Sequence, residues 1–310
     1  MILTVTLNAA IDKRYVVDEF KPGCVNRVKE CSYSAGGKGL NVARVAAIAG
    51  EEVLATGFVG GHAGNYIIDE LKEQNIKSDF VHIKGESRSC INIYDEANQS
   101  QTEFLEPGPT LTEDDKKQML LKYEQLIKEC KLVAISGSVP RGADSSLYIK
   151  MIEIAKQYSK MVILDTSGML LEDAIKAKPF MIKPNMDEIR MLTGRELKSF
   201  EELVQAARQL HLSGIELVVI SCGSLGSLIA CEEGIYRAYA PKVSVVNTVG
   251  CGDSLVAGFA VGICRGMRLT DTIKLATAIS AANAMCIETG YFKPEDVQKL
   301  LPRVNVEKLE

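Results

Sequence analysis

Residues 216–222 read ELVVISC, and this short run decides the class of fold. Four successive apolar side chains follow its glutamate, so both faces of a strand formed here would be buried. A strand that is buried on both faces is typical of a parallel sheet covered by helices on each side. Five further runs have this character: ILTVTL (2–7), EVLATGFVG (52–60), LVAISG (132–137), VILDTS (162–167) and FMIKPN (180–185).

Longer amphipathic segments separate these runs. We expect helices at 39–49, 64–75, 112–130, 145–159, 186–193 and 200–213, and two more at 252–266 and 270–288. Short β-branched runs that alternate with helices are the pattern of βαβ units. Because no repeat or low-complexity linker interrupts the chain, residues 1–310 are expected to form a single α/β domain with a mostly parallel sheet.

Two stretches, 12–35 and 86–105, depart from this rhythm because polar and apolar residues alternate in them. Such alternation is the mark of half-exposed strands. We expect these strands to form a small sheet that projects from the main domain as a lid over a site. A surface hairpin without function fits the alternation equally well.

Charge and cysteine usage exclude several classes of protein. Lys and Arg total 36 against 40 Asp and Glu, so the net charge of −4 gives no electrostatic reason to expect nucleic acid or an anionic membrane as partner. The nine cysteines include no CxxC pair and the chain has three histidines, which argues against a zinc site. With no basic leader and no uncharged apolar run of about 20 residues, a soluble, cytoplasmic protein with reduced thiols is expected.

The segment TVGCGDSL (248–255) places Asp253 behind two glycines at the start of an apolar helix. We expect a strand at 243–246 before it, and free amides at the helix start to form an anion site. Asp253 is then either a favourable charge at the helix N-terminus or a base beside bound phosphate. A dinucleotide fingerprint does not fit, because Leu255 stands where its third glycine would be.

The segment SAGGKGLNVARVAAIAG (34–50) leads three glycines around Lys38 into a second helix. Gly39 follows the lysine, so this is not a Walker A loop. Lys38 offers a point charge suited to phosphate, and the alternative is a glycine turn with a solvated lysine. Arg88, on the expected lid, is a second candidate for gripping a phosphate.

Two further segments follow predicted strands. IKPNMDEI (182–189) contains Asn185 and Glu188, which could support a hydrated Mg²⁺ or simply begin a helix. SCGSLGSLIA (221–230) contains Gly226, which either makes a hairpin turn or lets a nucleotide lie flat against the backbone.

Together these segments resemble the ribokinase-like, PfkB-type carbohydrate kinases. AGGKGLNVAR (35–44) is similar to the first family signature and NTVGCGDSLVAGF (247–259) to the second, with Cys251 where alanine is usual; IKPNMDE is similar to the magnesium-supporting motif. The lysine of GGKGLN, with TLNAAID (6–12), resembles the subgroup that phosphorylates sugar phosphates, namely tagatose-6-phosphate kinases and 1-phosphofructokinases. VNRV (25–28), KGESRSCINI (84–93) and TEFLEPGP (102–109) are most similar to the former.

The resemblance implies a ribokinase-like fold and a role for each matching residue. Asp253 would be the catalytic base, with the amides of Gly250, Cys251 and Gly252 holding charge on the transferring phosphoryl group. Mg²⁺ would be supported, largely through water, by Asn185 and Glu188. The substrate site would comprise Asp12, Gly37, Lys38, Asn41 and Arg88. The ATP site would comprise Lys183, Asn185, Ser221, Gly223, Ser224, Gly226, Gly252 and Asn283.

The activity expected from the resemblance is phosphoryl transfer from ATP to a ketohexose phosphate, converting tagatose 6-phosphate to tagatose 1,6-bisphosphate. A 1-phosphofructokinase, which makes fructose 1,6-bisphosphate from fructose 1-phosphate, is the alternative within the class. A non-catalytic sensor of sugar phosphate or nucleotide is the alternative from another class, although Asp253, the paired glycines and Asn185 argue against it. The family also suggests a homodimer formed through the lid.

Overall fold

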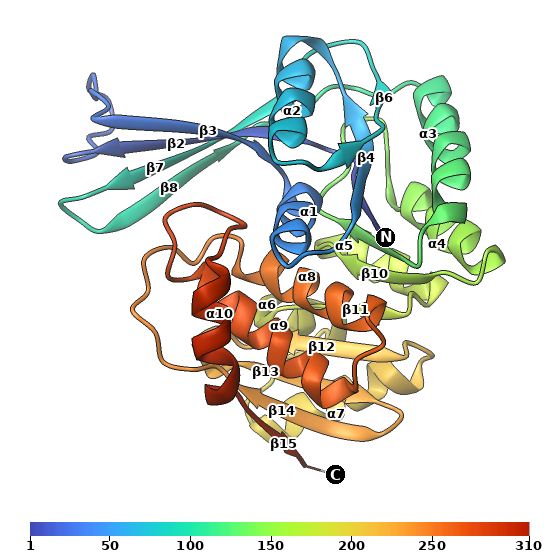
Figure 1. The fold of residues 1–310 in the computed structure, drawn as a ribbon. Coiled ribbons are helices and arrows are strands. Elements are labelled where there is room, and N and C mark those ends of the chain that lie inside the picture. Colours follow the sequence, from blue (N-terminus) through green and yellow to red (C-terminus); the bar gives the residue numbers. More distant parts are fainter. Residues whose placement is uncertain (310) are drawn as a thin grey trace.

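The computed structural model describes residues 1–309, and its main feature is one large twisted sheet (Figure 1). Across the sheet the strand order is β15-β14-β13-β12-β11-β10-β9-β1-β4-β5, with β6 also paired to β4. Neighbours from β5 to β12 run parallel, and β12 to β15 are antiparallel. The expected mostly parallel α/β fold is therefore confirmed.

The strands of this sheet match the six apolar runs and add several that the sequence reading missed. The expected ones are β1 (Ile2–Thr6), β4 (Val53–Val59), β9 (Leu132–Ser136), β10 (Met161–Asp165), β11 (Met181–Ile182) and β12 (Leu217–Ser221). The additional ones are β5 (Lys77–Ser78), β6 (Val81–His82), β13 (Ser227–Cys231), β14 (Gly234–Tyr239) and β15 (Asn305–Lys308). The strand expected at 243–246 is wrong: Val246 is 52% exposed, and its amide donates to the carbonyl of Ala284 rather than to a strand.

Helices cover both faces of the sheet, because successive strand side chains point to opposite sides and both sets are apolar. In β9, Leu132 and Ala134 join one buried cluster while Val133 and Ile135 join the other. The first cluster includes α1 (Lys38–Ile48), α2 (Gly61–Glu73), α8 (Cys251–Cys264), α9 (Leu269–Asn283) and α10 (Pro294–Leu300). The second includes α3 (Glu113–Leu126), α4 (Ser145–Gln157), α5 (Gly168–Ala174), α6 (Met186–Thr193) and α7 (Phe200–Leu212).

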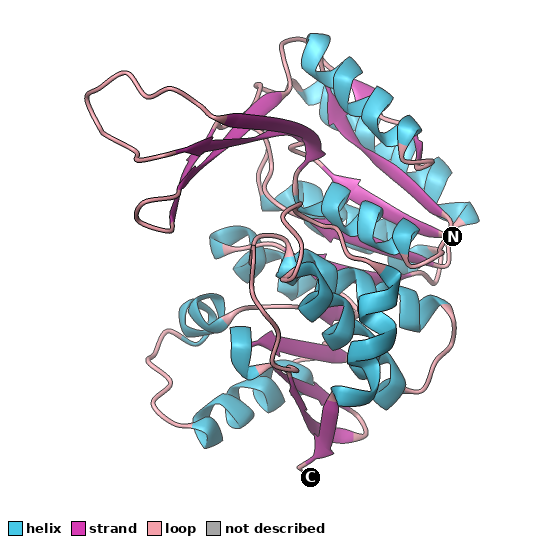
Figure 2. Cartoon of the chain, turned by 60° about the vertical axis from the view of Figure 1, so that its left-hand side comes forward, coloured by secondary structure: helices cyan, strands magenta, loops and turns pink. Residues whose placement is uncertain are grey.

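A second, four-stranded sheet projects from the main body, as Figures 1 and 2 both show. Its order is β3 (Glu30–Gly36), β2 (Ala10–Val17), β7 (Arg88–Asp95) and β8 (Ser100–Leu105), and we call it the lid sheet. The two alternating stretches of sequence supply these strands, with β2 beginning at Ala10 and β3 ending at Gly36. Asp12 lies opposite Ser34 on one side and Cys90 on the other, so these three side chains share one face.

None of the helices in the described part of the chain combines the length and the apolar character that a bilayer span requires.

Candidate active site

A cleft of about 1340 Å³ lies between the lid sheet and the ends of the central strands. Ser136, Asp165 and Ser221 each end a strand of the main sheet and line this cleft. In parallel sheets, ligands bind outside the carboxyl ends of the strands. From the other side the lid sheet contributes Asp12 and Arg88.

The glycine loop, residues 248–252, leads into α8 and carries Asp253 to the cleft wall. Gly250 is the N-cap of this helix with φ 82°, a left-handed conformation that glycine adopts without steric cost. Asp253 follows in the first helical turn and is 6% exposed. The rest of α8 is buried almost throughout, so the helix and its first turn are fixed by packing.

Asp253 is bonded to a residue that lies more than 200 positions earlier. Asn41 Nδ2 donates to Asp253 Oδ2 at 2.8 Å, which joins the two glycine-flanked helices α1 and α8. Burial raises the pKa of Asp253 above its ordinary value, and the nearby Lys38 ammonium and the Asn41 hydrogen bond offset this only in part. A carboxyl with a raised pKa is a better proton acceptor than an ordinary one.

Asp165 is a site residue that the sequence reading missed. It ends β10, its side chain is fully buried, and its Oδ1 lies 3.3 Å from Lys183 Nζ and 3.6 Å from Lys38 Nζ. Neither carboxylate oxygen accepts a hydrogen bond of regular geometry from residues 1–309, so the two ammonium groups are its charged partners. The Asp165 charge is the main reason why the pKa of Lys38 is raised, so that this lysine stays charged. The available signal was the lone carboxylate that follows the apolar run VIL in VILDTS.

The lid side of the cleft holds Asp12 and Arg88. Burial raises the pKa of Asp12 to about 6, although the charges of Arg44 and Arg88 act to lower it. Arg88 is fixed through two of its donors: Nε donates to the carbonyl of Asn8 at 3.0 Å and Nη1 to that of Glu106 at 3.1 Å. Its remaining N–H groups are available for a ligand with acceptor oxygens.

Comparisons with known proteins show which family the chain belongs to. A model described as the pfkB family of carbohydrate kinases matches residues 3–296. The chain belongs to this family. It is 38% identical over 309 residues to a tagatose-6-phosphate kinase of Staphylococcus epidermidis, and the match covers 99% of each chain.

Two solved structures resemble this pfkB kinase over nearly its whole length. Phosphofructokinase-2 of Escherichia coli, in complex with potassium, superposes with a TM-score of 0.92 at 28% identity, covering 97% of this chain and 98% of that one. Ribokinase of Arabidopsis thaliana, complexed with ribose and ATP, gives a TM-score of 0.80 at 22% identity, covering 97% of this chain and 98% of that one. The second likeness is evidence for a ribokinase-like fold alone.

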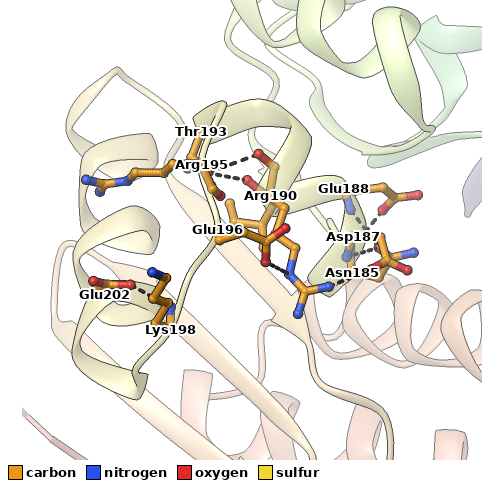
Figure 3. A network of polar contacts seen from close by, with 10 residues as sticks. Asn185, Asp187, Glu188, Arg190, Thr193, Arg195, Glu196, Lys198 and Glu202 are labelled. Carbon is orange, nitrogen blue, oxygen red and sulfur yellow. Dashed lines mark hydrogen bonds and ion pairs between the residues drawn. The ribbon is translucent and has the colours of Figure 1, made fainter.

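Asn185 and Glu188 of the kinase form the start of α6 (Figure 3). Asn185 Oδ1 accepts from the amides of Asp187 at 2.9 Å and Glu188 at 2.8 Å, while Glu188 Oε2 accepts from the Asn185 amide at 2.8 Å. This reciprocal capping box is the helix-start role left open by the sequence. It leaves Glu188 Oε1 outside the box, so the pair retains an oxygen of the type Mg²⁺ prefers. Among residues 1–309, no group of three or more His, Cys, Asp or Glu is arranged to hold a metal ion.

The residues expected at the ATP site fall into two groups. Five of them line the cleft: Lys183, Asn185, Ser221, Gly223 and Gly252. Ser224 is exposed and does not line it. Gly226, with φ 94°, makes the hairpin turn between β12 and β13, and a side chain there would collide with the carbonyl of Ala238.

Asn283 lies behind the glycine loop rather than in the cleft, which corrects its expected position. It is fully buried at the end of α9; its Nδ2 donates to the carbonyl of Val249 at 3.0 Å and its Oδ1 accepts from Ser254 Oγ at 3.0 Å. Asn283 therefore supports the loop and the first turn of α8. The amide of Cys251 is also engaged, since it donates to the carbonyl of Thr248 at 3.2 Å.

The predicted substrate residues come together more closely. Asp12, Gly37, Lys38, Asn41 and Arg88 all line the same cleft as Asp253. Lys38 lies toward Asp165 and Asp253, whereas Arg88 lies at the base of the lid sheet. A further lining residue, Arg44, was not expected; it stands one helical turn after Asn41 in the same signature.

Proposed function

We propose that this pfkB kinase transfers the γ-phosphoryl group of ATP to a hydroxyl of tagatose 6-phosphate and forms tagatose 1,6-bisphosphate. The observation that carries the proposal is the buried carboxylate of Asp253, which faces the same cleft as the cations Lys38 and Arg88. A base and cations for anionic groups are the parts that phosphoryl transfer to a sugar phosphate requires. The identity to the Staphylococcus epidermidis tagatose-6-phosphate kinase supports the choice of sugar.

Asp253 acts as the general base. Its carboxylate accepts the proton of the attacking hydroxyl while that oxygen bonds to the γ-phosphorus and the bond to the ADP oxygen breaks. The hydrogen bond from Asn41 holds one carboxylate oxygen, Oδ2, in a fixed direction. Asp12, Gly37 and Asn41 orient the sugar through its hydroxyls, which supplies the alignment on which this chemistry depends.

The charge of the transferring group is met by the start of α8 and by Lys38. The amides of Gly250, Cys251 and Gly252 lie at the positive end of the helix, and that of Cys251 exchanges its bond to Thr248 for one to the phosphoryl oxygens. Lys38 and Arg88 grip the phosphate already on the sugar. The position of Lys38 beside Asp165 also brings its charge close to the reacting centre.

The nucleotide lies along the carboxyl ends of β11 and β12. Lys183, Asn185, Ser221 and Gly223 line this part of the cleft. Mg²⁺, when bound with the nucleotide, neutralises phosphate charge. Asn185 and Glu188 would support this ion, largely through water, and Glu188 Oε1 would be the available oxygen because the capping box leaves it outside.

We also propose that two copies pair through their lid sheets. β3 and β8 are the edge strands of this sheet, and Tyr33 and Phe104 on them are 48% and 51% exposed. Pairing would cover both the edges and these side chains. Sedimentation of the wild type and of Phe104→Lys tests this, with a monomeric wild type as the outcome against it.

The test of the activity is an ADP-release assay with tagatose 6-phosphate, fructose 6-phosphate and fructose 1-phosphate in parallel. We expect the highest kcat/KM with tagatose 6-phosphate. A higher value with fructose 1-phosphate would make the protein a 1-phosphofructokinase instead. Binding of sugar phosphate and ATP without ADP release would identify a sensor and overturn the proposal.

A further inference from the structure

Arg44 of α1 is a buried arginine, 7% exposed, whose guanidinium is bonded on every side. Its Nε donates to Gln74 Oε1 at 3.0 Å, and its Nη1 donates to Asn41 Oδ1 at 3.1 Å and to the carbonyl of Thr289 at 3.2 Å. Its Nη2 donates to the carbonyl of Ala35, at the end of the lid strand β3. One side chain thus joins the lid sheet, the end of α2 and the loop after α9.

The contact with Asn41 determines which way that amide faces. Arginine can only donate hydrogen bonds, so the oxygen of the Asn41 amide must face Arg44. The nitrogen of the amide then faces Asp253 and donates to Oδ2 at 2.8 Å. A donor at this distance stabilises an ionised carboxylate, whereas the reversed amide would present its oxygen and favour the protonated form.

We propose that Arg44 is a positioning residue that orients the Asn41 amide and thereby keeps Asp253 ionised and aligned to accept the substrate proton. This inference rests on the proposed role of Asp253 as the base. The hydrogen bonds of Arg44 reach Asp253 through Asn41, because its other hydrogen-bond partners lie on α2, β3 and the loop after α9. Its charge also acts through space on Asp12 and Asp253.

Other charged groups also act on Asp253 and Asp12, and their effects on the pH profile must be distinguished from the effect of Arg44. The pKa of Asp253 is affected by the charges of three residues: Lys38 on α1, Asp165 on β10 and Lys183 in the segment after β11. The charge of Arg44 also lowers the pKa of Asp12 on the lid sheet. Removing Arg44 would therefore affect Asp12 as well as Asp253, and the experiment needs a background in which Asp12 cannot ionise.

The first measurement compares wild type with Arg44→Met between about pH 5 and pH 9. We expect kcat with tagatose 6-phosphate to fall by about tenfold to hundredfold, the effect of losing one hydrogen bond to a charged group. The acidic limb of kcat/KM should move upward by about one pH unit, because Asp253 then takes up its proton at higher pH. KM for ATP should change by less than about twofold.

The second measurement tests whether Arg44 acts through Asn41. The kcat of the double variant Arg44→Met/Asn41→Ala should equal that of Asn41→Ala within about twofold. Without the Asn41 amide, Arg44 no longer has a hydrogen-bonded connection to Asp253. In an Asp12→Asn background the acidic limb should still move when Arg44 is replaced. The inference would be overturned if the kcat losses of the two single variants multiplied in the double variant. It would also be overturned if the acidic limb no longer moved in the Asp12→Asn background.

Three further variants serve as a control for arginine removal, as a substitute if Arg44→Met does not fold, and as a separate test of the base. Arg265→Met removes an arginine that bonds Glu51 and the carbonyl of Ala49 at the far end of α1, and it should leave kcat and the acidic limb unchanged. If thermal melting shows that Arg44→Met does not fold, Arg44→Lys keeps the charge but loses the planar fork, and the same limb shift is expected. Asp253→Asn tests the base independently, so near-normal turnover there would overturn the proposed function and not only this inference.

Discussion

Lys183 and Asp165 form a buried ion pair at the floor of the cleft, with Lys183 Nζ 3.3 Å from Asp165 Oδ1 and side chains 5% and 0% exposed. Lys38 approaches the same oxygen from α1 at 3.6 Å. Asp253 also interacts with both lysines, so two ammonium groups face two carboxylates at this wall. The lysines are held there as point charges that can meet the phosphate oxygens of a nucleotide or a sugar.

Asp165→Asn should destabilise the protein by about 3 kcal/mol, because it leaves Lys183 buried without its counter-charge. Urea unfolding followed by circular dichroism measures the free energy of unfolding. Asp18→Asn is the matched control: Asp18 pairs with Lys29 at 2.9 Å on the surface, and losing an exposed pair should cost less than about 1 kcal/mol. Equal losses for the two variants would contradict the structural role given to Asp165.

Asp253→Asn should keep the fold and lower kcat by about a hundredfold to ten-thousandfold, since general base catalysis is removed. Its unfolding midpoint should not fall at neutral pH, because burial already raises the pKa of the carboxyl it replaces. The ADP-release assay and a thermal melt provide both readings. Asp271→Asn, which changes a surface pair with Arg268, should leave kcat intact. Turnover near that of wild type in Asp253→Asn would remove Asp253 as the base.

Arg88→Gln and Lys38→Met should each raise KM for tagatose 6-phosphate by about tenfold or more while KM for ATP stays within about twofold. Each removes a cation expected to meet the phosphate on the sugar. Lys38→Met should also lower kcat, because the Lys38 charge acts on Asp253 and Asp165. Steady-state kinetics with each substrate varied in turn makes the measurement. An equal rise in both KM values would count against a sugar-phosphate clamp.

Local pattern was enough to predict the strands that are buried on both faces, and it failed where exposure is set by distant neighbours. ELVVISC forms β12 because its apolar side chains pack into both clusters. The similar run at 243–246 forms no strand, because Val245 and Val246 are 61% and 52% exposed and the Val246 amide bonds to the end of α9. The sequence of the run itself does not indicate that Ala284 is the hydrogen-bond partner of Val246.

The same division holds in the site. Asp253 and Lys38 could be found because glycines and a helix start surround each of them in the sequence. Asp165 and Arg44 were missed because their roles depend on contacts between elements. The lone carboxylate after VIL was the one sequence signal for Asp165, whose role depends on two lysines from other elements. The role of Arg44 depends on the contact that its helix neighbour Asn41 makes with Asp253 on α8. Asn283 was assigned to the cleft, yet tertiary packing places it beneath the glycine loop.

Asp12 gives a prediction about stability as a function of pH. Its pKa in the folded protein is about 6 against an ordinary 3.8, so folding favours the protonated form. Wild-type stability should therefore fall as pH rises from about 4 to about 6, and Asp12→Asn should escape this loss. The variant should gain up to about 3 kcal/mol over wild type above pH 6 and nothing below about pH 4.

Asp95, on the same lid sheet, provides the control with the opposite sign. Hydrogen bonds from Asn98 and from the amide of Phe20 lower the pKa of Asp95, so ionisation stabilises the fold. Asp95→Asn should therefore be less stable than wild type at neutral pH, with the difference shrinking as pH falls. Thermal melts of wild type and both variants at matched pH values measure the two trends. Loss of a carboxylate stabilises the fold only where folding raises its pKa. A shift of the melting temperature in the same direction for Asp12→Asn and Asp95→Asn at neutral pH would therefore show that burial does not raise the pKa of Asp12.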